Sequence, residues 1–319
     1  MSPAMMVVGG MLTKSQLIKY AWFALAVNLA VIIWGAFVRA SGSGAGCGDH
    51  WPLCNGQVVP QSPLNTTLIE FAHRLTSGLA VITVALLVVW AFRAFPKGYG
   101  VRGGALLALL AIIIESAIGA GLVLLRLVGS NDSFSRGIWL GAHLLNTLFL
   151  LAALSVTAWL SGANTPIREL QLKLPRSIWI STIGFLAAGV LGTFAALGDT
   201  LTVPTSFATG LQADFSPISN IFVRLRILHP LVAGAFGIWL IVLSFRAGAK
   251  GIGRMMATLV VCQFAVGLAN IALKTPVLVQ LLHLLIADLL WIAFVLWTCE
   301  LQRVNRQDSR SPRPEFVYH

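Results

Sequence analysis

Charged side chains are scarce in this chain of 319 residues. Asp, Glu, Lys and Arg make up 10% of it, against about 25% in ordinary soluble domains, and hydrophobic residues make up 57%. The mean hydropathy is +0.84. So little charge excludes a soluble domain. It indicates an all-α integral membrane protein whose surroundings are the lipid bilayer.

Cysteine is also rare, with four residues in the whole sequence. Cys262 and Cys299 lie in hydrophobic stretches, where we expect them to be inert packing residues. Cys47 and Cys54 lie in a polar segment together with His50, which we expect to be solvated. The spacing of this pair fits either a disulfide or a redox-active dithiol in an oxidising compartment.

Eight hydrophobic stretches are long enough to cross a bilayer as helices, which takes about 20 residues each. Only two connections are long, Arg39–Thr67 after the first stretch and Gly198–Asn220 after the fifth. The predicted transmembrane helices are Tyr20–Val38, Leu68–Phe95, Gly104–Leu125, Gly137–Leu160, Ile178–Leu197, Ile221–Phe245, Ile252–Leu273 and Val277–Leu301.

The formal net charge of +11 is distributed very unevenly. Most Lys and Arg residues fall on one side of the predicted helices, and this side is expected to be cytoplasmic. Both termini are therefore predicted to be cytoplasmic and both long connections external, and nucleic-acid binding is excluded as the reason for the charge. The N-terminus lacks the features of a cleaved signal or transit peptide, which predicts an uncleaved anchor in a prokaryotic plasma membrane.

The sequence repeats itself along its length. His73 to Gly78 and His229 to Gly234 both read His-x-Leu-x-x-Gly, and two further histidines are each followed by Leu-Leu. Because each unit has four helices, the copies share one orientation, which predicts two parallel-repeat four-helix bundles. The expected organisation is a cytoplasmic N-terminus (1–19), an N-terminal bundle (20–160) with an external cysteine loop (39–67), a cytoplasmic linker (161–177), a C-terminal bundle (178–301) and a disordered cytoplasmic tail (302–319).

Four histidines lie at one depth, about two turns into alternate spans: His73, His143, His229 and His283. A histidine inside a membrane is costly unless it binds or conducts something, although a backbone carbonyl could satisfy a single one. Two facing imidazoles suit heme, which needs only axial ligands and an apolar slot. Zinc or copper would need further ligands, which the sequence around the second pair lacks.

Small and basic residues could complete such sites. Several glycines would either make room for a flat macrocycle or mediate helix packing: Gly78, Gly119, Gly121, Gly234 and Gly267. Heme propionates would point to the external face. The basic residues that could pair with them there are Arg74, Arg126, Arg136, Arg224, Arg226 and Lys274.

The two predicted halves differ in their acidic residues. Glu70 lies three residues before His73, where the second repeat has Arg226. A carboxylate there could move protons during an oxidation. Alternatively, Thr67 and Glu70 could form a capping box that begins the second helix.

Two further carboxylates lie inside predicted spans. Glu115 is in the third span, where the repeat places Gln263 in the seventh. It could hydrogen-bond a heme edge, relay protons or bridge helices, and Asp288, five residues after His283, leaves the same alternatives open.

Together, Glu70-x-x-His73-Arg74, the Cys47-x6-Cys54 pair and the later histidines resemble the heme A synthase family over essentially all eight spans. The resemblance implies conversion of heme O to heme A, by oxidation of a ring methyl to a formyl group, for terminal oxidase assembly. It implies that His73 and His143 flank heme O, that His229 and His283 ligate a resident heme B, that Glu70 is catalytic and that Cys47 and Cys54 are the external cysteine pair. Some members carry a second cysteine pair in the other long connection, which this chain lacks.

The resemblance also implies partners: a heme O synthase as heme donor, terminal oxidase assembly factors and an electron partner. Two other function classes remain open from the residues alone. A bis-histidine diheme electron carrier of the quinol oxidoreductase type would need the four histidines but would leave its hemes unmodified. A transporter built from parallel repeats is disfavoured, because the spans contain few breaks or opposing charges.

Overall fold

A computed structural model describes residues 13–61, 64–163, 174–202, 206–246 and 251–310. Within these ranges the regular structure is helical, apart from one isolated β-bridge between Cys54 and Gln57. Eight helical segments are long and apolar enough to cross a membrane. The prediction of an all-helical integral membrane protein with eight spans is confirmed.

All spanning helices except the seventh extend, at one end or both, beyond the hydrophobic stretches that predicted them. The first begins six residues early because Thr13 caps it: Thr13 Oγ1 accepts from the Gln16 backbone N–H, and the Gln16 side chain accepts from the Thr13 N–H. Hydropathy marks only the part of a helix that lies in lipid. The spans are α1 (Lys14–Ala40), α2 (Asn65–Ala94), α3 (Gly100–Leu124), α4 (Phe134–Ala163), α5 (Arg176–Leu201), α7 (Ile221–Leu225) with α8 (Leu228–Arg246), α9 (Ile252–Ala272) and α10 (Val277–Arg310).

Two predicted boundaries are wrong for the same reason. The tail was expected to be disordered from Gln302, yet α10 continues to Arg310, while residues 311–319 lie outside the described part. The second long connection was expected from Gly198, yet α5 continues to Leu201. The extension of α10 is rich in Gln and Arg, which a helix accepts readily, and neither helix ends where its hydrophobicity does. Of the predicted linker 161–177, residues 164–173 are not described.

The sixth span is interrupted between α7 and α8. Pro230 is the third residue of α8 and has no N–H to donate to the carbonyl four residues back. The chain therefore restarts its helix here, with the His229 N–H donating to the Arg226 carbonyl at 3.3 Å. The interruption places His229 in the first turn of α8, close to the polar connection.

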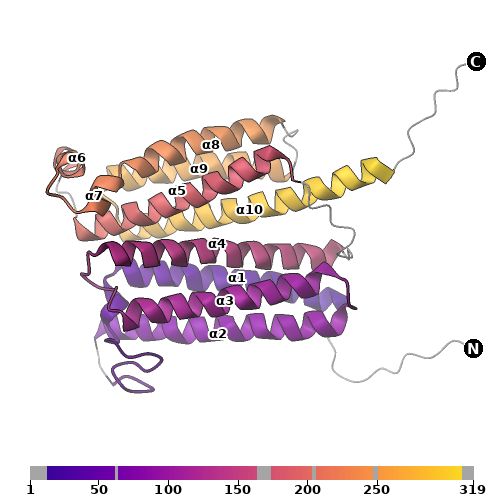
Figure 1. Cartoon of the computed structure of the whole chain (residues 1–319), viewed down its shortest axis with the longest axis horizontal. Coiled ribbons are helices and arrows are strands. Elements are labelled where there is room, and N and C mark those ends of the chain that lie inside the picture. The colour runs from indigo at the N-terminus through magenta and orange to yellow at the C-terminus, as the bar shows by residue number, and fades with distance from the viewer. Residues whose placement is uncertain (1–12, 62–63, 164–173, 203–205, 247–250, 311–319) are drawn as a thin grey trace, which may run out of the picture.

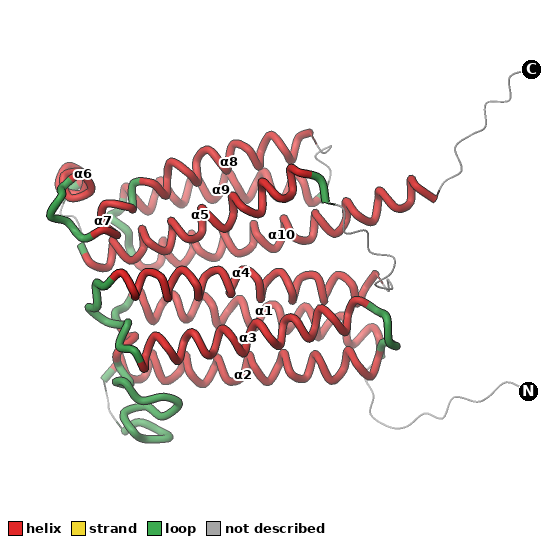
Figure 2. Tube along the Cα trace, in the orientation of Figure 1, coloured by secondary structure: helices red, strands yellow, loops and turns green. Residues whose placement is uncertain are grey.

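The spanning helices form two groups of four that pack side by side (Figure 1). Helices α1 to α4 lie on one side, and α5, α8, α9 and α10 on the other. Helix α4 contacts both α5 and α10, and α1 contacts α10. The long connection that contains η1 (Ser43–Ala45) and the one that contains α6 (Phe207–Phe215) lie at one end, opposite the start of α1 and the end of α10 (Figure 2).

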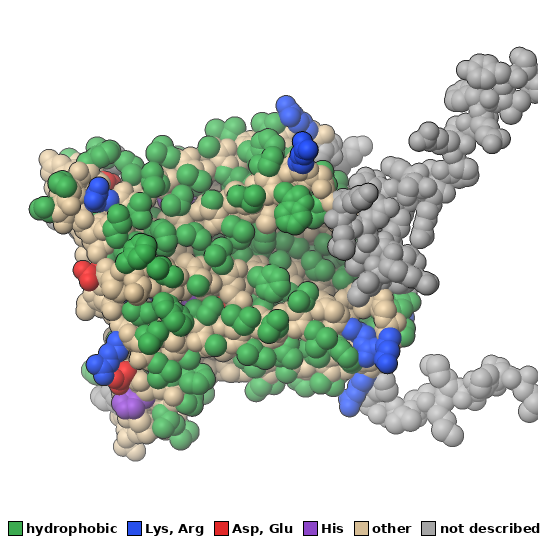
Figure 3. Space-filling view, in the orientation of Figure 1, with side chains coloured by type: hydrophobic (Ala, Val, Ile, Leu, Met, Phe, Trp, Pro, Cys, Tyr) green, Lys and Arg blue, Asp and Glu red, His purple; other side chains and the backbone are tan. Residues whose placement is uncertain are grey.

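Small residues allow close helix packing, and large apolar residues face outward. Ala21 of α1, Ala91 of α2 and Ala105 of α3 are fully buried, as expected where membrane helices approach closely. Exposed Leu, Ile and Phe side chains cover the visible long face of the helices, and Lys and Arg gather at the two ends (Figure 3). This distribution is that of a protein embedded in a bilayer.

Candidate functional site

Each of the four histidines lies against a glycine of the preceding odd-numbered span. A Cβ atom at Gly35 would lie 2.9 Å from His73 Cε1, so a side chain there would collide with the imidazole. Each glycine thus lets an imidazole lie directly against the backbone of the neighbouring helix. A Cβ at Gly119 would lie 3.9 Å from His143 Nε2. A Cβ at Gly192 would lie 3.0 Å from His229 Cε1, and one at Gly267 would lie 3.1 Å from His283 Cε1.

The second pair of imidazoles faces each other directly. The ring centroids of His229 and His283 are 6.2 Å apart with an interplanar angle of 87°. Because a metal–imidazole bond is about 2 Å long, this separation leaves room for one metal atom between the rings. His229 Nδ1 lies 3.1 Å from the Ala188 carbonyl, a partner that would keep the proton on Nδ1 and leave Nε2 as a ligand.

His283 is held by an amide that the sequence analysis assigned no role at this site. Gln263 Nε2 of α9 lies 3.2 Å from His283 Nε2. Metal binding by this nitrogen would exchange the amide contact for a metal bond. The other ring nitrogen, Nδ1, is buried and has no hydrogen-bond partner among the described residues.

The first pair has a more polar setting. His73 Nδ1 is likewise buried without a hydrogen-bond partner in the described part of the chain. His143 Nδ1 lies 3.0 Å from Glu115 Oε1 of α3. The two atoms are close enough for an ion pair but are not aligned for a hydrogen bond. His143 Nδ1 therefore has no hydrogen-bond partner among the described residues.

Glu70 is buried, with 4% of its surface exposed, and ties α2 to the external loop. Its Oε2 accepts from the Cys47 N–H at 2.8 Å, and its Oε1 accepts from Arg74 Nη2 at 2.5 Å. Arg74 Nη1 in turn donates to the carbonyls of His50 and Leu53 at 2.6 and 2.5 Å. The carboxylate is therefore fixed from two directions, with the loop as its support.

The alternative that Thr67 and Glu70 begin the second helix is wrong. Helix α2 begins at Asn65, so Thr67 is already inside it, and the Thr67 hydroxyl donates to the Gly46 carbonyl at 2.8 Å. Both side chains serve the loop rather than the helix end, because the folded loop brings its own backbone groups within reach.

A disulfide joins Cys47 and Cys54. Of the two alternatives for this pair, the structure has the disulfide, and both cysteines are buried. The Asn55 N–H donates to the Cys47 carbonyl at 3.0 Å, which closes the loop again beside the bridge.

The loop gives a first prediction. Replacing both cysteines by serine removes a cross-link worth about 2 kcal/mol in a loop this short and loosens the N–H of residue 47 that Glu70 accepts from. For the reaction that the heme A synthase resemblance implies, we expect less product heme at an unchanged total of bound heme, both measured in one preparation. Cys262→Ser, in α9 and outside the loop, is the matched control. Full activity in the double variant would contradict the support role of the loop.

The sequence of this chain matches a known family. The profile of the COX15-CtaA family, cytochrome oxidase assembly protein, matches residues 18–295. Heme A synthase of Geobacillus kaustophilus is 44% identical over 128 residues, 39% of either chain. That of Exiguobacterium sibiricum is 23% identical over 297 residues, 91% of this chain and 97% of the relative. The chain belongs to the heme A synthase family.

Another relative carries a different name. A Thermus thermophilus protein named protoheme IX farnesyltransferase is 43% identical over 313 residues, which are 95% of this chain but 52% of the relative. The chain thus spans about half the length of that relative.

The histidine sites fit the heme that this family handles. Nδ1 of His73, His143 and His283 is buried without a hydrogen-bond partner among the described residues, and each of the four histidines lies against a glycine of the neighbouring helix. No group of three or more His, Cys, Asp or Glu side chains that could hold a metal ion occurs among the described residues, and heme needs only two axial ligands from the protein.

Among the other glycines, the structure separates the two alternatives. A Cβ at Gly78 or Gly234 would have no described atom within 4 Å, so neither glycine is a helix contact. Gly121 is one: a Cβ there would lie 2.3 Å from Trp139 Cζ3. The suggestion that Gly121 makes room for a macrocycle is wrong, because the Trp139 side chain of α4 fills that space.

Several basic residues proposed as propionate partners already have protein partners. Arg136 donates to the carbonyls of Gly129 and Asn131 at 2.8 and 2.5 Å. Arg74 is held by Glu70 and the loop. A propionate would have to compete with these contacts. Arg224 lies in α7 and Lys274 in the turn after α9.

Arg126 and Arg226 form ion pairs at the end of the molecule that carries the long connections. Arg126 Nη2 lies 2.5 Å from Asp49 Oδ2 in the external loop. Arg126 thereby holds the pKa of the Asp49 carboxyl below its usual range, so this pair is kept at neutral pH and lost only as the pH falls into the acid range. Arg226 lies 3.3 Å from Asp199 Oδ1 and also pairs with Asp214.

Two polar residues, the half-buried Arg39 and the buried Asp288, were not assigned a site by sequence reasoning. Arg39 of α1 donates to the Ala196 carbonyl at 3.0 Å and to Gln280 Oε1 at 3.3 Å, and so joins the two groups of helices. A basic residue at the end of a span is explained by membrane topology, so the sequence did not single out Arg39. Asp288 is 1% exposed, and its Oδ2 has no hydrogen-bond partner in the described residues.

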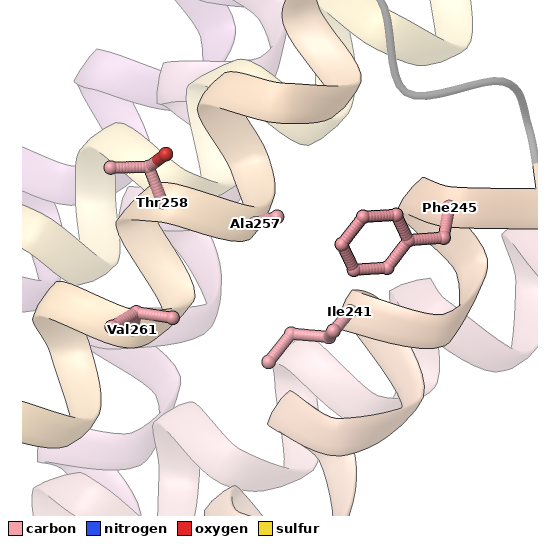
Figure 4. A pocket seen from close by; sticks show the side chains of 5 residues that line it. All are labelled: Ile241, Phe245, Ala257, Thr258 and Val261. Carbon is pink, nitrogen blue, oxygen red and sulfur yellow. The ribbon is translucent and has the colours of Figure 1, made fainter.

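An apolar pocket of about 270 Å³ lies between α8 and α9, away from the histidines (Figure 4). Ile241, Phe245, Ala257, Thr258 and Val261 line it. Ile241 is twelve residues beyond His229, about 18 Å along a helix at ~1.5 Å per residue. The pocket is therefore not part of the histidine sites.

Proposed function

We propose that this chain is a heme A synthase that oxidises a ring methyl of heme O to a formyl group and so provides heme A for terminal oxidase assembly. The observation that carries the proposal is the buried Glu70 carboxylate, held on the helix of His73 by the disulfide loop. The corresponding position near His229 is Arg226, which pairs with Asp199 and Asp214 instead. Only one of the two similar histidine sites thus carries an acid suited to an oxidation.

In this proposal the two halves of the chain have separate tasks. Residues 20–160 hold the substrate heme O between His73 and His143. Residues 178–301 hold heme B, with His229 and His283 as its axial ligands. The facing rings of the second pair and the histidine–glycine contacts in both halves support this division, as does the implied parallel repeat of four helices.

Heme B, when bound, would supply electron transfer between the substrate site and an external electron partner. Each of two successive oxidations replaces one C–H bond of the methyl by a C–O bond to a water oxygen and releases two protons and two electrons, which the external electron partner accepts. The geminal diol that results loses water to leave the formyl group. Every C–H bond broken changes the protonation of the site, so a positioned proton carrier is needed. Glu70 fulfils this role, because Cys47 and Arg74 hold both of its oxygens in place while leaving each a further lone pair.

The same arrangement gives the external disulfide a supporting role. Cys47 contributes its backbone N–H to Glu70 and its sulfur to the bridge. Neither group needs to react for the loop to act, since the loop keeps water and side chains in order around the carboxylate. This role uses a single cysteine pair, which is what the chain has.

The name of the Thermus relative supports a proposal about which enzyme supplies the substrate. Its name is that of a farnesyltransferase acting on protoheme IX, and this chain matches only 52% of its length. We propose that the same kind of activity, a heme O synthase, hands heme O to this chain within the membrane. Co-purification from mild detergent tests this contact, and two proteins that separate under all mild conditions would contradict it.

The charge distribution supports a location in a prokaryotic plasma membrane with both ends of the chain in the cytoplasm. The disulfide loop then lies on the external side, where oxidising conditions favour the Cys47–Cys54 bond. Terminal oxidase assembly factors would receive the product on this membrane.

Mass spectrometry of extracted hemes tests the reaction. A host that makes heme O but lacks its own heme A synthase is compared with and without this chain. We expect heme A, or its hydroxymethyl precursor, only when the chain is present. Bound but unmodified heme B with no new product would contradict the proposal and favour a diheme electron carrier.

A further inference from the structure

Glu115 lies inside the membrane-spanning part of α3 and contacts three residues on one face of α4. Its Oε1 is 3.0 Å from His143 Nδ1, and its Oε2 accepts from Asn146 Nδ2 at 2.6 Å. Its Oε1 also accepts from the Thr147 hydroxyl. Positions 143, 146 and 147 are one turn apart and share a face, so a single carboxylate binds the whole polar face around His143.

A glycine of the same helix, with no side chain, lies beside the other nitrogen of the imidazole. Gly119 follows Glu115 by one turn of α3, and a Cβ there would lie 3.9 Å from His143 Nε2, an ordinary contact distance. Helix α3 thus presents an acid to Nδ1 and a bare backbone near Nε2. A histidine that binds a metal through one ring nitrogen usually has a carboxylate or carbonyl at the other, and His143 has this arrangement, with Glu115 at Nδ1 and Nε2 as the candidate ligand.

The second half has no equivalent of this polar face. Gln263 of α9 stands in the repeat position of Glu115 and contacts His283 through the other ring nitrogen, Nε2, at 3.2 Å. The residues three and four positions after His283 are Ile286 and Ala287, where α4 has Asn146 and Thr147. Gln263 Oε1 is buried without a hydrogen-bond partner among the described residues.

We propose that Glu115 is a positioning residue that makes the two histidine pairs electronically different, an inference that rests on the proposed function. Its carboxylate orients His143 through Nδ1 and places a negative charge beside that ligand. Hydrogen bonding or charge at the outer nitrogen makes the imidazole a stronger donor and lowers the reduction potential of the iron it binds. The neutral Gln263 leaves the iron of the second half with the higher potential, so electrons released at the substrate site pass toward the second half.

Spectroelectrochemical titration of the purified protein, loaded with heme O and heme B, tests this inference. Glu115→Gln keeps the shape of the side chain but removes the charge, and we expect the midpoint potential of the heme in the first half to rise. Gln263→Glu adds a charge beside His283, and we expect the potential of heme B to fall. Glu300→Gln is the matched control, because this carboxylate accepts from Trp159 Nε1 at 2.7 Å and lies 17 residues beyond His283, about 25 Å along α10.

The outcomes are distinguishable from those of the proposed function. Unchanged potentials in both variants would overturn the positioning role, whether or not heme A is made. Shifted potentials in the expected directions would support it even in a preparation that forms no heme A, and in that case only the proposed reaction would fail. If Glu115→Gln does not fold, the Gln263→Glu variant still decides, because a heme B potential that stays constant or rises contradicts the inference.

Discussion

Replacing Glu70 by glutamine is expected to lower heme A formation by about 100-fold or more, the usual contribution of a positioned proton carrier. Glutamine keeps the length of the side chain and can still accept one hydrogen bond, from Cys47 or Arg74, so the loop stays in place. The loss of heme A formation would therefore come from the missing proton carrier and not from a displaced loop. Product heme per bound heme O, measured by mass spectrometry, gives the result.

Two comparisons make this result decisive. Glu300→Gln changes a carboxylate outside the histidine sites and is expected to keep wild-type activity. Bound heme O should remain in the Glu70→Gln variant, because the proposed axial ligands His73 and His143 are unchanged. A Glu70→Gln protein that produces heme A at the normal rate would show that Glu70 is not the proton carrier of the reaction.

Replacing His283 by alanine is expected to abolish stable heme B binding. One of the two facing imidazoles disappears, and the 6.2 Å arrangement with His229 is lost. The loss should exceed the roughly 10–100-fold weakening that follows removal of an outer-shell partner. The ratio of heme to protein after purification, from absorption spectra, measures it.

His50→Ala is the control for this variant. The His50 side chain is more than half exposed in the external loop, and its link to Arg74 uses the backbone carbonyl, which alanine retains. We expect wild-type heme content from it. Equal heme content and identical spectra in His283→Ala and His50→Ala would contradict the assignment of His283 as a ligand.

The sequence could predict the features that depend on hydrophobicity and repetition. The eight spans follow from long apolar stretches, and the described part of the chain has eight such helical segments. Gly119 and Gly267 stood out from the sequence as small residues near the histidines, and the structure places each of them against a histidine. These features are periodic and local, so one sequence is enough to see them.

Other features depend on contacts that no local pattern encodes. Glu70 resembled part of a helix cap because its partner Cys47 is 23 residues away, across a folded loop. Glu115 left three alternatives open until its contacts with Asn146 and Thr147 showed that it bridges α3 and α4. Gly121 looked like the other glycines, and only the position of Trp139 revealed its packing role.

The contacts between the two groups of helices have a mechanical consequence. Near one end Arg39 of α1 is bonded to α5 and α10, and toward the other end Trp159 of α4 is bonded to Glu300 of α10. Between them Trp291 Nε1 donates to the Leu148 carbonyl at 2.7 Å. A rocking movement of one group against the other, as alternating access in a transporter requires, would have to break bonds at both ends at once. These bonds favour a fixed arrangement of the two groups of helices, in which electrons or protons, rather than a transported solute, would move between the histidine pairs.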